Sequence, residues 1–153
     1  MTVLRELNAD FRDLLLAFAG ERVEFVIVGA YALALHGAPR FTGDFDVFVR
    51  PSPANGQRVW RALVRFGAPV AAAGVTAADF EMPGVVYQIG LPPSRIDVLT
   101  EISGVTFDEA WAKREAADLE GYVVHFIGRA ALIRNKEAAG RPKDLADVAR
   151  LRR

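Results

Sequence analysis

The sequence contains no cysteine and only two histidines, His36 and His125. The absence of cysteine excludes disulfides, thiolate zinc sites and cysteine nucleophiles. Two histidines are too few for a histidine-rich metal centre. A metal in this protein would therefore have to be held by carboxylates, and oxygen ligands favour Mg²⁺ or Mn²⁺.

Net charge and long apolar runs are also missing. The 19 Lys and Arg residues balance the 19 Asp and Glu residues, so any affinity for phosphate or nucleic acid must come from local patches. No apolar run approaches the roughly 20 residues needed to cross a bilayer, and the amphipathic, acid-bearing N-terminus differs from a signal or transit peptide. We expect a cytoplasmic protein with no membrane partner, and 153 residues suit a single domain over 1–153.

Hydrophobic periodicity predicts helices and strands in a mixed order. The three-residue connection Pro92-Pro93-Ser94 requires the strands on either side of it to be antiparallel. The Ala- and Gly-rich segment 68–80 has no clear pattern. The whole is typical of an α+β or mixed α/β fold: a small mixed sheet flanked by helices, with a pair of helices at the C-terminus. Helices are expected over 3–20, 31–36, 53–66, 130–139 and 142–151, with a short one after Thr106, and strands over 23–28, 44–50, 85–91, 95–100, 115–118 and 122–127.

Two acids lie one residue apart on the second predicted strand. Strand alternation places Asp44 and Asp46 on one face, with Phe45 on the other. Carboxylates this close repel each other unless a cation lies between them, so the pair predicts a divalent-metal site. The strand RIDVLT places Arg95 and Asp97 on one face, and if it neighbours the first strand, Asp97 completes a three-carboxylate site. Taken alone, Asp97 fits an exposed ion pair with Arg95 equally well.

Gly29 lies where a predicted strand runs into a helix. Backbone N–H groups at such a junction suit a phosphate, and the missing side chain lets the phosphate approach. The further glycines of a dinucleotide-binding motif are absent, which excludes that interpretation. A triphosphate beside Gly29, with metal on Asp44 and Asp46, is the layout for phosphoryl or nucleotidyl transfer.

These motifs resemble those of the DNA polymerase beta-type nucleotidyltransferase superfamily. Its signature is an apolar residue, Gly, then Gly or Ser, about a dozen residues, an Asp-apolar-Asp pair and a later strand with a third acid. The sequence has Val28-Gly29-Ala30, then Asp44-Phe45-Asp46, then Ile96-Asp97-Val98. The segments GAYALALHGAPRFTGDFDV and ALIRNKEAAGRPKDLADV are similar to the AbiEii/MenT-like branch, which includes toxins of toxin–antitoxin systems.

The resemblance implies a nucleotidyltransferase fold and a set of site residues. Asp44 and Asp46 would be metal ligands, and Asp97 a third ligand or the general base for the acceptor hydroxyl. Ala30, where many members have Gly or Ser, keeps its backbone N–H but offers no hydroxyl to the phosphates. The other implied nucleotide-binding residues are Gly29, Arg40, Thr42, Lys136, Lys143, Asp144 and Asp147.

Several of these residues also have simpler interpretations. Lys143 and Asp147, four apart on a helix, could form a surface ion pair worth a few tenths of a kcal/mol. From Arg129 onward there are eight Lys and Arg residues and three acids. This positive charge could bind a triphosphate or RNA, or it could form a solvated surface.

The activity implied is Mg²⁺- or Mn²⁺-dependent transfer of a nucleoside monophosphate from a nucleoside triphosphate (NTP) to an acceptor hydroxyl. RNA, including tRNA, or a protein side chain is the implied acceptor, and a cognate antitoxin is the implied partner. Two alternatives are a non-catalytic nucleotide- or partner-binding subunit with the same fold and a kinase that uses the same site.

Overall fold

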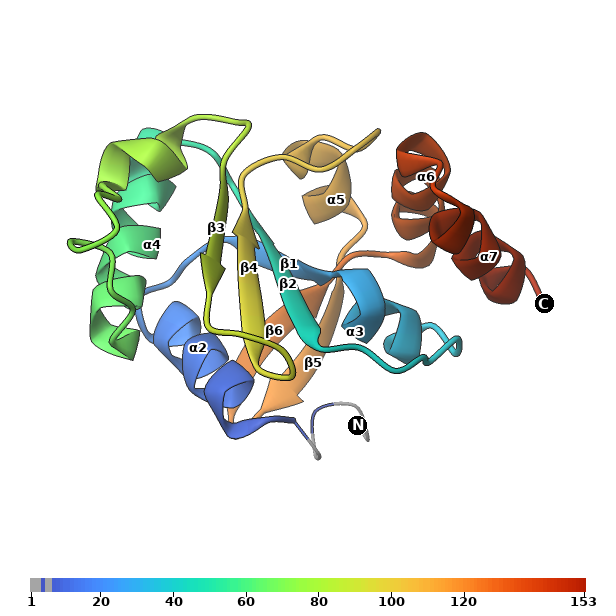
Figure 1. Ribbon diagram of the computed structural model, residues 1–153, viewed down its shortest axis with the longest axis horizontal. Coiled ribbons are helices and arrows are strands. Elements are labelled where there is room, and N and C mark those ends of the chain that lie inside the picture. Colours follow the sequence, from blue (N-terminus) through green and yellow to red (C-terminus); the bar gives the residue numbers. More distant parts are fainter. Residues whose placement is uncertain (1–3, 5–6) are drawn as a thin grey trace.

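A computed structural model of the protein describes residue 4 and residues 7–153. Its centre is a mixed six-stranded sheet with the order β3-β4-β2-β1-β6-β5 (Figure 1). β2 pairs in parallel with β4 and antiparallel with β1, so these three strands lie side by side in the middle of the sheet. The strands are β1 (Phe25–Val28), β2 (Asp44–Val49), β3 (Val86–Ile89), β4 (Arg95–Leu99), β5 (Glu115–Leu119) and β6 (Tyr122–Phe126).

Helices cover the sheet and extend from one side of it. α2 and α4 pack together over one face, while α5 and the α6–α7 pair lie on the other side (Figure 1). α3 follows β1 directly and packs against the central strand β2 through Tyr31, whose ring meets that of Phe45 edge to face at 5.1 Å. The helices are α2 (Ala9–Gly20), α3 (Gly29–Leu35), α4 (Pro53–Phe66), α5 (Phe107–Ala112), α6 (Arg129–Ala139) and α7 (Pro142–Leu151), with a 3₁₀ turn η1 (Ala77–Glu81).

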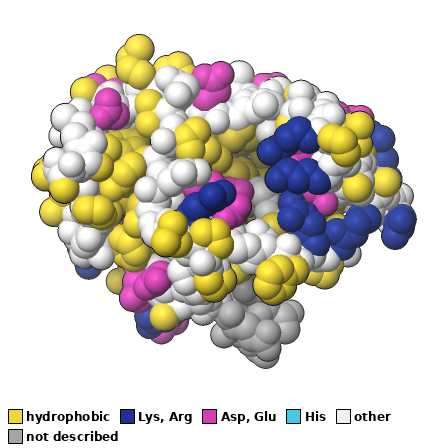
Figure 2. All heavy atoms as spheres, viewed as in Figure 1, with side chains coloured by type: hydrophobic (Ala, Val, Ile, Leu, Met, Phe, Trp, Pro, Cys, Tyr) yellow, Lys and Arg dark blue, Asp and Glu magenta, His cyan; other side chains and the backbone are white. Residues whose placement is uncertain are grey.

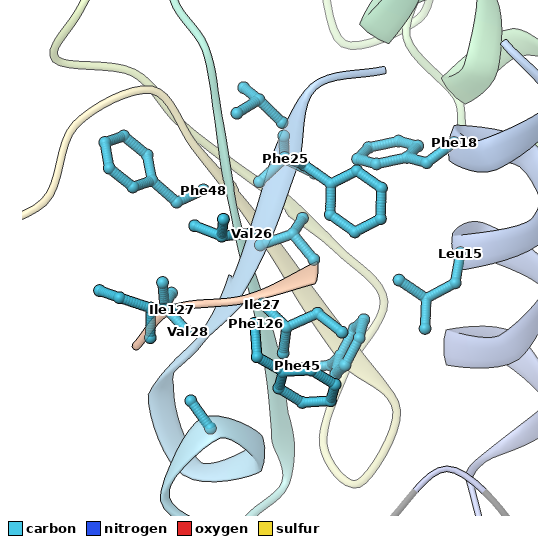
Figure 3. Close-up of a cluster of buried hydrophobic side chains, with 14 of the residues drawn as sticks. Leu15, Phe18, Phe25, Val26, Ile27, Val28, Phe45, Phe48, Phe126 and Ile127 are labelled. Atoms are coloured by element: carbon cyan, nitrogen blue, oxygen red, sulfur yellow. The ribbon is translucent and has the colours of Figure 1, made fainter. Parts of the chain in front are cut away.

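Part of the hydrophobic core lies between α2 and the central strands. Figure 3 shows Leu15 and Phe18 of α2 facing Phe25 and Phe45 of the sheet. All four side chains are buried. Burying such a side chain contributes roughly 1.5–3 kcal/mol, so these contacts fix which face of β2 is turned toward α2. Asp44 and Asp46, which alternate with Phe45 along β2, must therefore face away from α2.

The expected elements are largely confirmed, with differences at their ends. The first predicted helix, over 3–20, is interrupted: Leu4 is helical, Leu7 is not, and Val3 lies outside the described residues. α2 begins at Ala9, where the Asn8 side chain caps it by accepting a hydrogen bond from the Asp10 N–H. The segment without a clear pattern runs into η1. The antiparallel β3–β4 pair occurs as predicted, and the strands β5 and β6 also pair antiparallel.

Within residue 4 and residues 7–153, no helix combines the length and apolarity that a membrane span requires.

Candidate active site

The two central parallel strands bring three carboxylates together. β2 and β4 pair in register, with Asp46 opposite Asp97 and Asp44 opposite Arg95. Phe45, between the two acids of β2, stacks on Phe11 of α2 at a ring-centroid distance of 4.8 Å. That contact holds the opposite face of β2, and with it both acids, away from the α2 core.

Gly29 closes the site from the neighbouring strand. Val28 at the end of β1 is in register with Asp46, so the next residue meets the Asp46 side chain. Gly29 has a φ of +67°, and a Cβ placed on it would lie 2.3 Å from Asp46 Oδ2. Backbone conformation and space therefore both require glycine here.

These residues line a cavity of about 310 Å³ that has basic residues around it. Figure 2 shows this face, with a band of Lys and Arg side chains over α6 and α7 and, across a hollow, a smaller acidic group around one basic side chain. Acids and bases thus share one cavity, as a metal-bound phosphate ester would require. The lining consists of Gly29, Ala30, Arg40, Thr42, Asp44, Asp46, Arg95, Asp97, Leu99, Lys136, Arg141 and Lys143.

A larger cavity, of about 490 Å³, lies beside Phe48 and the residues that follow β4. Its charged lining residues are Glu101 and Glu109, with neither Lys nor Arg among its lining. A triphosphate carries several negative charges, so the smaller cavity is the one suited to it.

The neighbouring carboxylates raise the affinity of Asp46 for a proton. Burial, the negative charge of Asp97 with a hydrogen bond to it, and the charge of Asp44 raise the pKa of Asp46 from 3.8 to about 7, while Lys136 opposes them. The structure therefore places a carboxyl where its charge is poorly compensated. Such sites are candidates for cation binding or catalysis.

Arg95 is the cation nearest to the carboxylates. Its Nη2 donates a hydrogen bond to Asp44 Oδ2 at 2.9 Å, and its Nε lies 3.5 Å from Asp97 Oδ1. The second contact is an ion pair without a hydrogen bond, and both of its atoms are buried with no hydrogen-bond partner. Asp97 is thus neither freely exposed nor fully satisfied.

The three carboxylates offer the oxygen ligands that a hard divalent cation prefers, although Asp44 and Asp97 contact Arg95. No three His, Asp or Glu side chains of the described part of the chain are already arranged as a metal-ligand set. Asp44, Asp46 and Asp97 nevertheless offer only oxygen, and Asp97 Oδ1 lacks a donor. A divalent cation would also relieve the repulsion that raises the pKa of Asp46.

A buried ion-pair network anchors the basic side of the cavity. Lys136 Nζ lies 3.2 Å from Asp147 Oδ2 and 3.5 Å from Asp144 Oδ1, and the two acids are 2% and 0% exposed. Arg40 binds Asp147 through Nε and Nη2 at 3.1 and 3.3 Å, and Arg141 Nε donates to Asp144 at 2.6 Å. The acids of α7 therefore position three cations of the cavity lining.

Most of the expected site residues meet in this cavity. Gly29, Ala30, Arg40, Thr42, Asp44, Asp46, Asp97, Lys136 and Lys143 all line it. Asp144 and Asp147 do not: they lie behind the lining, in the ion-pair network. The surface pair between Lys143 and Asp147 does not form, because Asp147 is buried and bound to Lys136 and Arg40.

Three lining residues were missing from the expected set: the apolar Leu99 and two charged residues, Arg95 and Arg141. Arg95 carried a signal, since it alternates with Asp97 on the same strand face. Arg141 carried none: it precedes Pro142 in a stretch whose sequence indicates only the start of a helix.

The sequence matches no protein-family model and no curated protein. Solved structures do match its fold. ANT(2″)-Ia, solved in complex with adenylyl-2″-tobramycin, is 16% identical with a TM-score of 0.56, over 92% of this chain and 84% of its own. A candidate nucleotidyltransferase from Thermotoga maritima is 14% identical with a TM-score of 0.54, over 93% and 88%. An antigenic nucleotidyltransferase-like protein from Paracoccidioides brasiliensis is 16% identical with a TM-score of 0.51, over 95% and 77%. The chain thus has the fold of these nucleotidyltransferases, a mixed sheet flanked by helices.

Proposed function

We propose that the protein transfers a nucleoside monophosphate from an NTP to an acceptor hydroxyl with the help of Mg²⁺ or Mn²⁺. The observation that carries this proposal is the meeting of Asp44, Asp46 and Asp97 with Gly29 and Lys136 in one cavity. The acids supply the oxygen ligands that a divalent cation prefers. The glycine and the lysine leave room and charge for the phosphates beside it.

The basic residues of the lining bind the triphosphate. Lys136 is held by two buried acids, so its ammonium is fixed in place before the substrate arrives. Arg141 and Lys143, at the start of α7, add charge at the same opening. Such preorganised charge stabilises the leaving pyrophosphate without reorganisation during the reaction.

The transfer is an in-line displacement. The acceptor oxygen forms a bond to the α-phosphorus as the bond to the bridging oxygen of pyrophosphate breaks, and pyrophosphate leaves with that electron pair. The hydroxyl proton passes to the carboxylate of Asp97 and from there to water. A bound divalent cation would supply neutralisation of phosphate charge, with Asp44, Asp46 and Asp97 as the residues that would hold it.

RNA, including tRNA, is the acceptor that we propose. The band of Lys and Arg over α6 and α7 adjoins the cavity and could bind a phosphate backbone (Figure 2). A small hydroxyl compound is the second candidate, because ANT(2″)-Ia was solved with an adenylylated small molecule. A toxin role with a cognate antitoxin is proposed on the resemblance of two sequence segments to toxin nucleotidyltransferases.

Nucleotides with an α-³²P label, incubated with Mg²⁺, the protein and total RNA, test the activity. We expect label in RNA and release of pyrophosphate, and neither with Asp46→Asn. Label transferred only from γ-³²P nucleotide, with diphosphate release, would identify a kinase instead. Calorimetric binding of NTP and Mg²⁺ without turnover on RNA or small hydroxyl compounds would identify a binding subunit.

A further inference from the structure

Four side chains from β2 and β4 form a small charged array on one face of the sheet. Asp44 lies opposite Arg95, and Asp46 lies opposite Asp97. Three corners of the array are thus acids, and the fourth is a guanidinium. The array is a direct result of the in-register parallel pairing, so Arg95 cannot avoid the neighbourhood of the acids.

Arg95 holds the oxygens that a metal ion would need. Its Nη2 occupies Asp44 Oδ2 at 2.9 Å, and its Nε approaches Asp97 Oδ1 to 3.5 Å. A metal ion cannot take Asp44 and Asp97 as ligands while the guanidinium lies between them. The two positive charges repel each other, and both would need the same carboxylate lone pairs. Bound metal and the observed position of Arg95 therefore exclude each other.

The hold of Arg95 on this position is incomplete. Its Nε and Asp97 Oδ1 are buried and lack a hydrogen-bond partner. A buried polar atom left without a partner is costly, so a better partner can displace the present one. The Arg95 side chain is 30% exposed and lines the same cavity as Lys136 and Arg141, where a triphosphate would provide new acceptors.

We propose that Arg95 is an internal counter-ion that occupies the divalent-cation site and leaves it for the triphosphate when metal and nucleotide bind. This inference rests on the proposed function. It makes metal and nucleotide binding mutually favourable, because each helps to move the same side chain. Metal alone binds weakly, since it has to displace the guanidinium with no new acceptor for it.

The proposal is tested by measuring Mn²⁺ affinity in the absence of nucleotide, with electron paramagnetic resonance as the readout. The proteins compared are the wild type, Arg95→Gln and Arg141→Gln. Arg141 is the matched control, because it lines the same cavity and loses the same charge but binds Asp144 rather than the array. We expect about tenfold tighter Mn²⁺ binding for Arg95→Gln and no more than about twofold for Arg141→Gln. Circular dichroism checks that each variant is folded, and Arg95→Lys, which keeps the charge but not the fork, should stay closer to the wild type.

A second measurement follows the coupling. A non-hydrolysable NTP analogue should tighten Mn²⁺ binding to the wild type by a larger factor than to Arg95→Gln. Equal Mn²⁺ affinity of the wild type and Arg95→Gln, or an equal gain in Arg141→Gln, would overturn the role of Arg95 and leave the proposed function standing. Absence of Mn²⁺ binding to every variant, with or without the analogue, would instead reject the metal-dependent function and this inference with it.

Discussion

Asp46→Asn should raise the free energy of unfolding of the metal-free protein. The same substitution should abolish activity. In the folded protein the pKa of Asp46 is raised to about 7, first by burial and then by Asp97 and Asp44. The folded state therefore binds this proton more tightly than the unfolded chain, where the pKa is near 3.8. The stability contributed by the protonated form is fully present below pH 3.8 and is lost as the pH rises to about 7.

The size of the effect follows from that difference. A pKa difference of about three corresponds to about 4 kcal/mol. Between pH 5 and pH 8 about 3 kcal/mol of this penalty should develop in the wild type and none in the asparagine variant. The neutral amide resembles the protonated carboxyl in shape and can still hydrogen-bond to Asp97.

Urea unfolding in EDTA, followed by circular dichroism at pH 5 and pH 8, measures the difference. We expect the advantage of Asp46→Asn to grow by about 2–3 kcal/mol over this range. Excess Mg²⁺ should stabilise the wild type alone, because a ligand of the folded state adds to its stability. An asparagine variant that gains nothing between pH 5 and pH 8 would refute the claim that crowded carboxylates destabilise this site.

Two further substitutions probe the lining of the cavity. Gly29→Ala and Gly74→Ala both place a side chain at positive φ, at a cost of about 1–2 kcal/mol, but only the first also meets Asp46 Oδ2. We expect Gly29→Ala to lose more unfolding free energy than Gly74→Ala, and to lose Mn²⁺ binding, which Gly74→Ala should keep; retained binding in Gly29→Ala would show that the close approach is unimportant. Lys136→Met should cost about 3 kcal/mol in urea unfolding, because it leaves buried carboxylates short of a cation, whereas Lys143→Met, at an exposed position, should cost under about 0.5 kcal/mol but weaken NTP binding. Equal stability losses for the two lysines would contradict the buried network.

Much of the fold was predictable because its signals are local. The helix expected over 53–66 is α4: Ser52 caps its start, Pro53 stands in its first turn, and Gly67 in a left-handed conformation ends it. The Thr106–Glu109 capping box is present at the start of α5. Each of these depends on neighbouring residues only, so the sequence carries the whole cause.

The site was only partly predictable because its last contacts are long-range. Alternation along β2 placed Asp44 and Asp46 on one face, and the structure agrees. The pairing of Asp147 with Arg40, 107 residues away, has no local signal, and neither does the arrival of Arg141 at the cavity. Alternation also placed Arg95 on the face of Asp97, but its position between two acids depends on the register of β2 with β4.

That register also explains how so divergent a chain can keep one architecture. The separation of Asp46 and Asp97 across the strands is set by the main-chain ladder, at about 4.8 Å, and not by the packing of any particular side chain. Substitutions elsewhere can accumulate, and helices can be exchanged or rebuilt around the sheet, without altering that spacing. The main chain thus fixes the distance between the two acids, and the residues around them that bind a substrate can change in evolution without altering it.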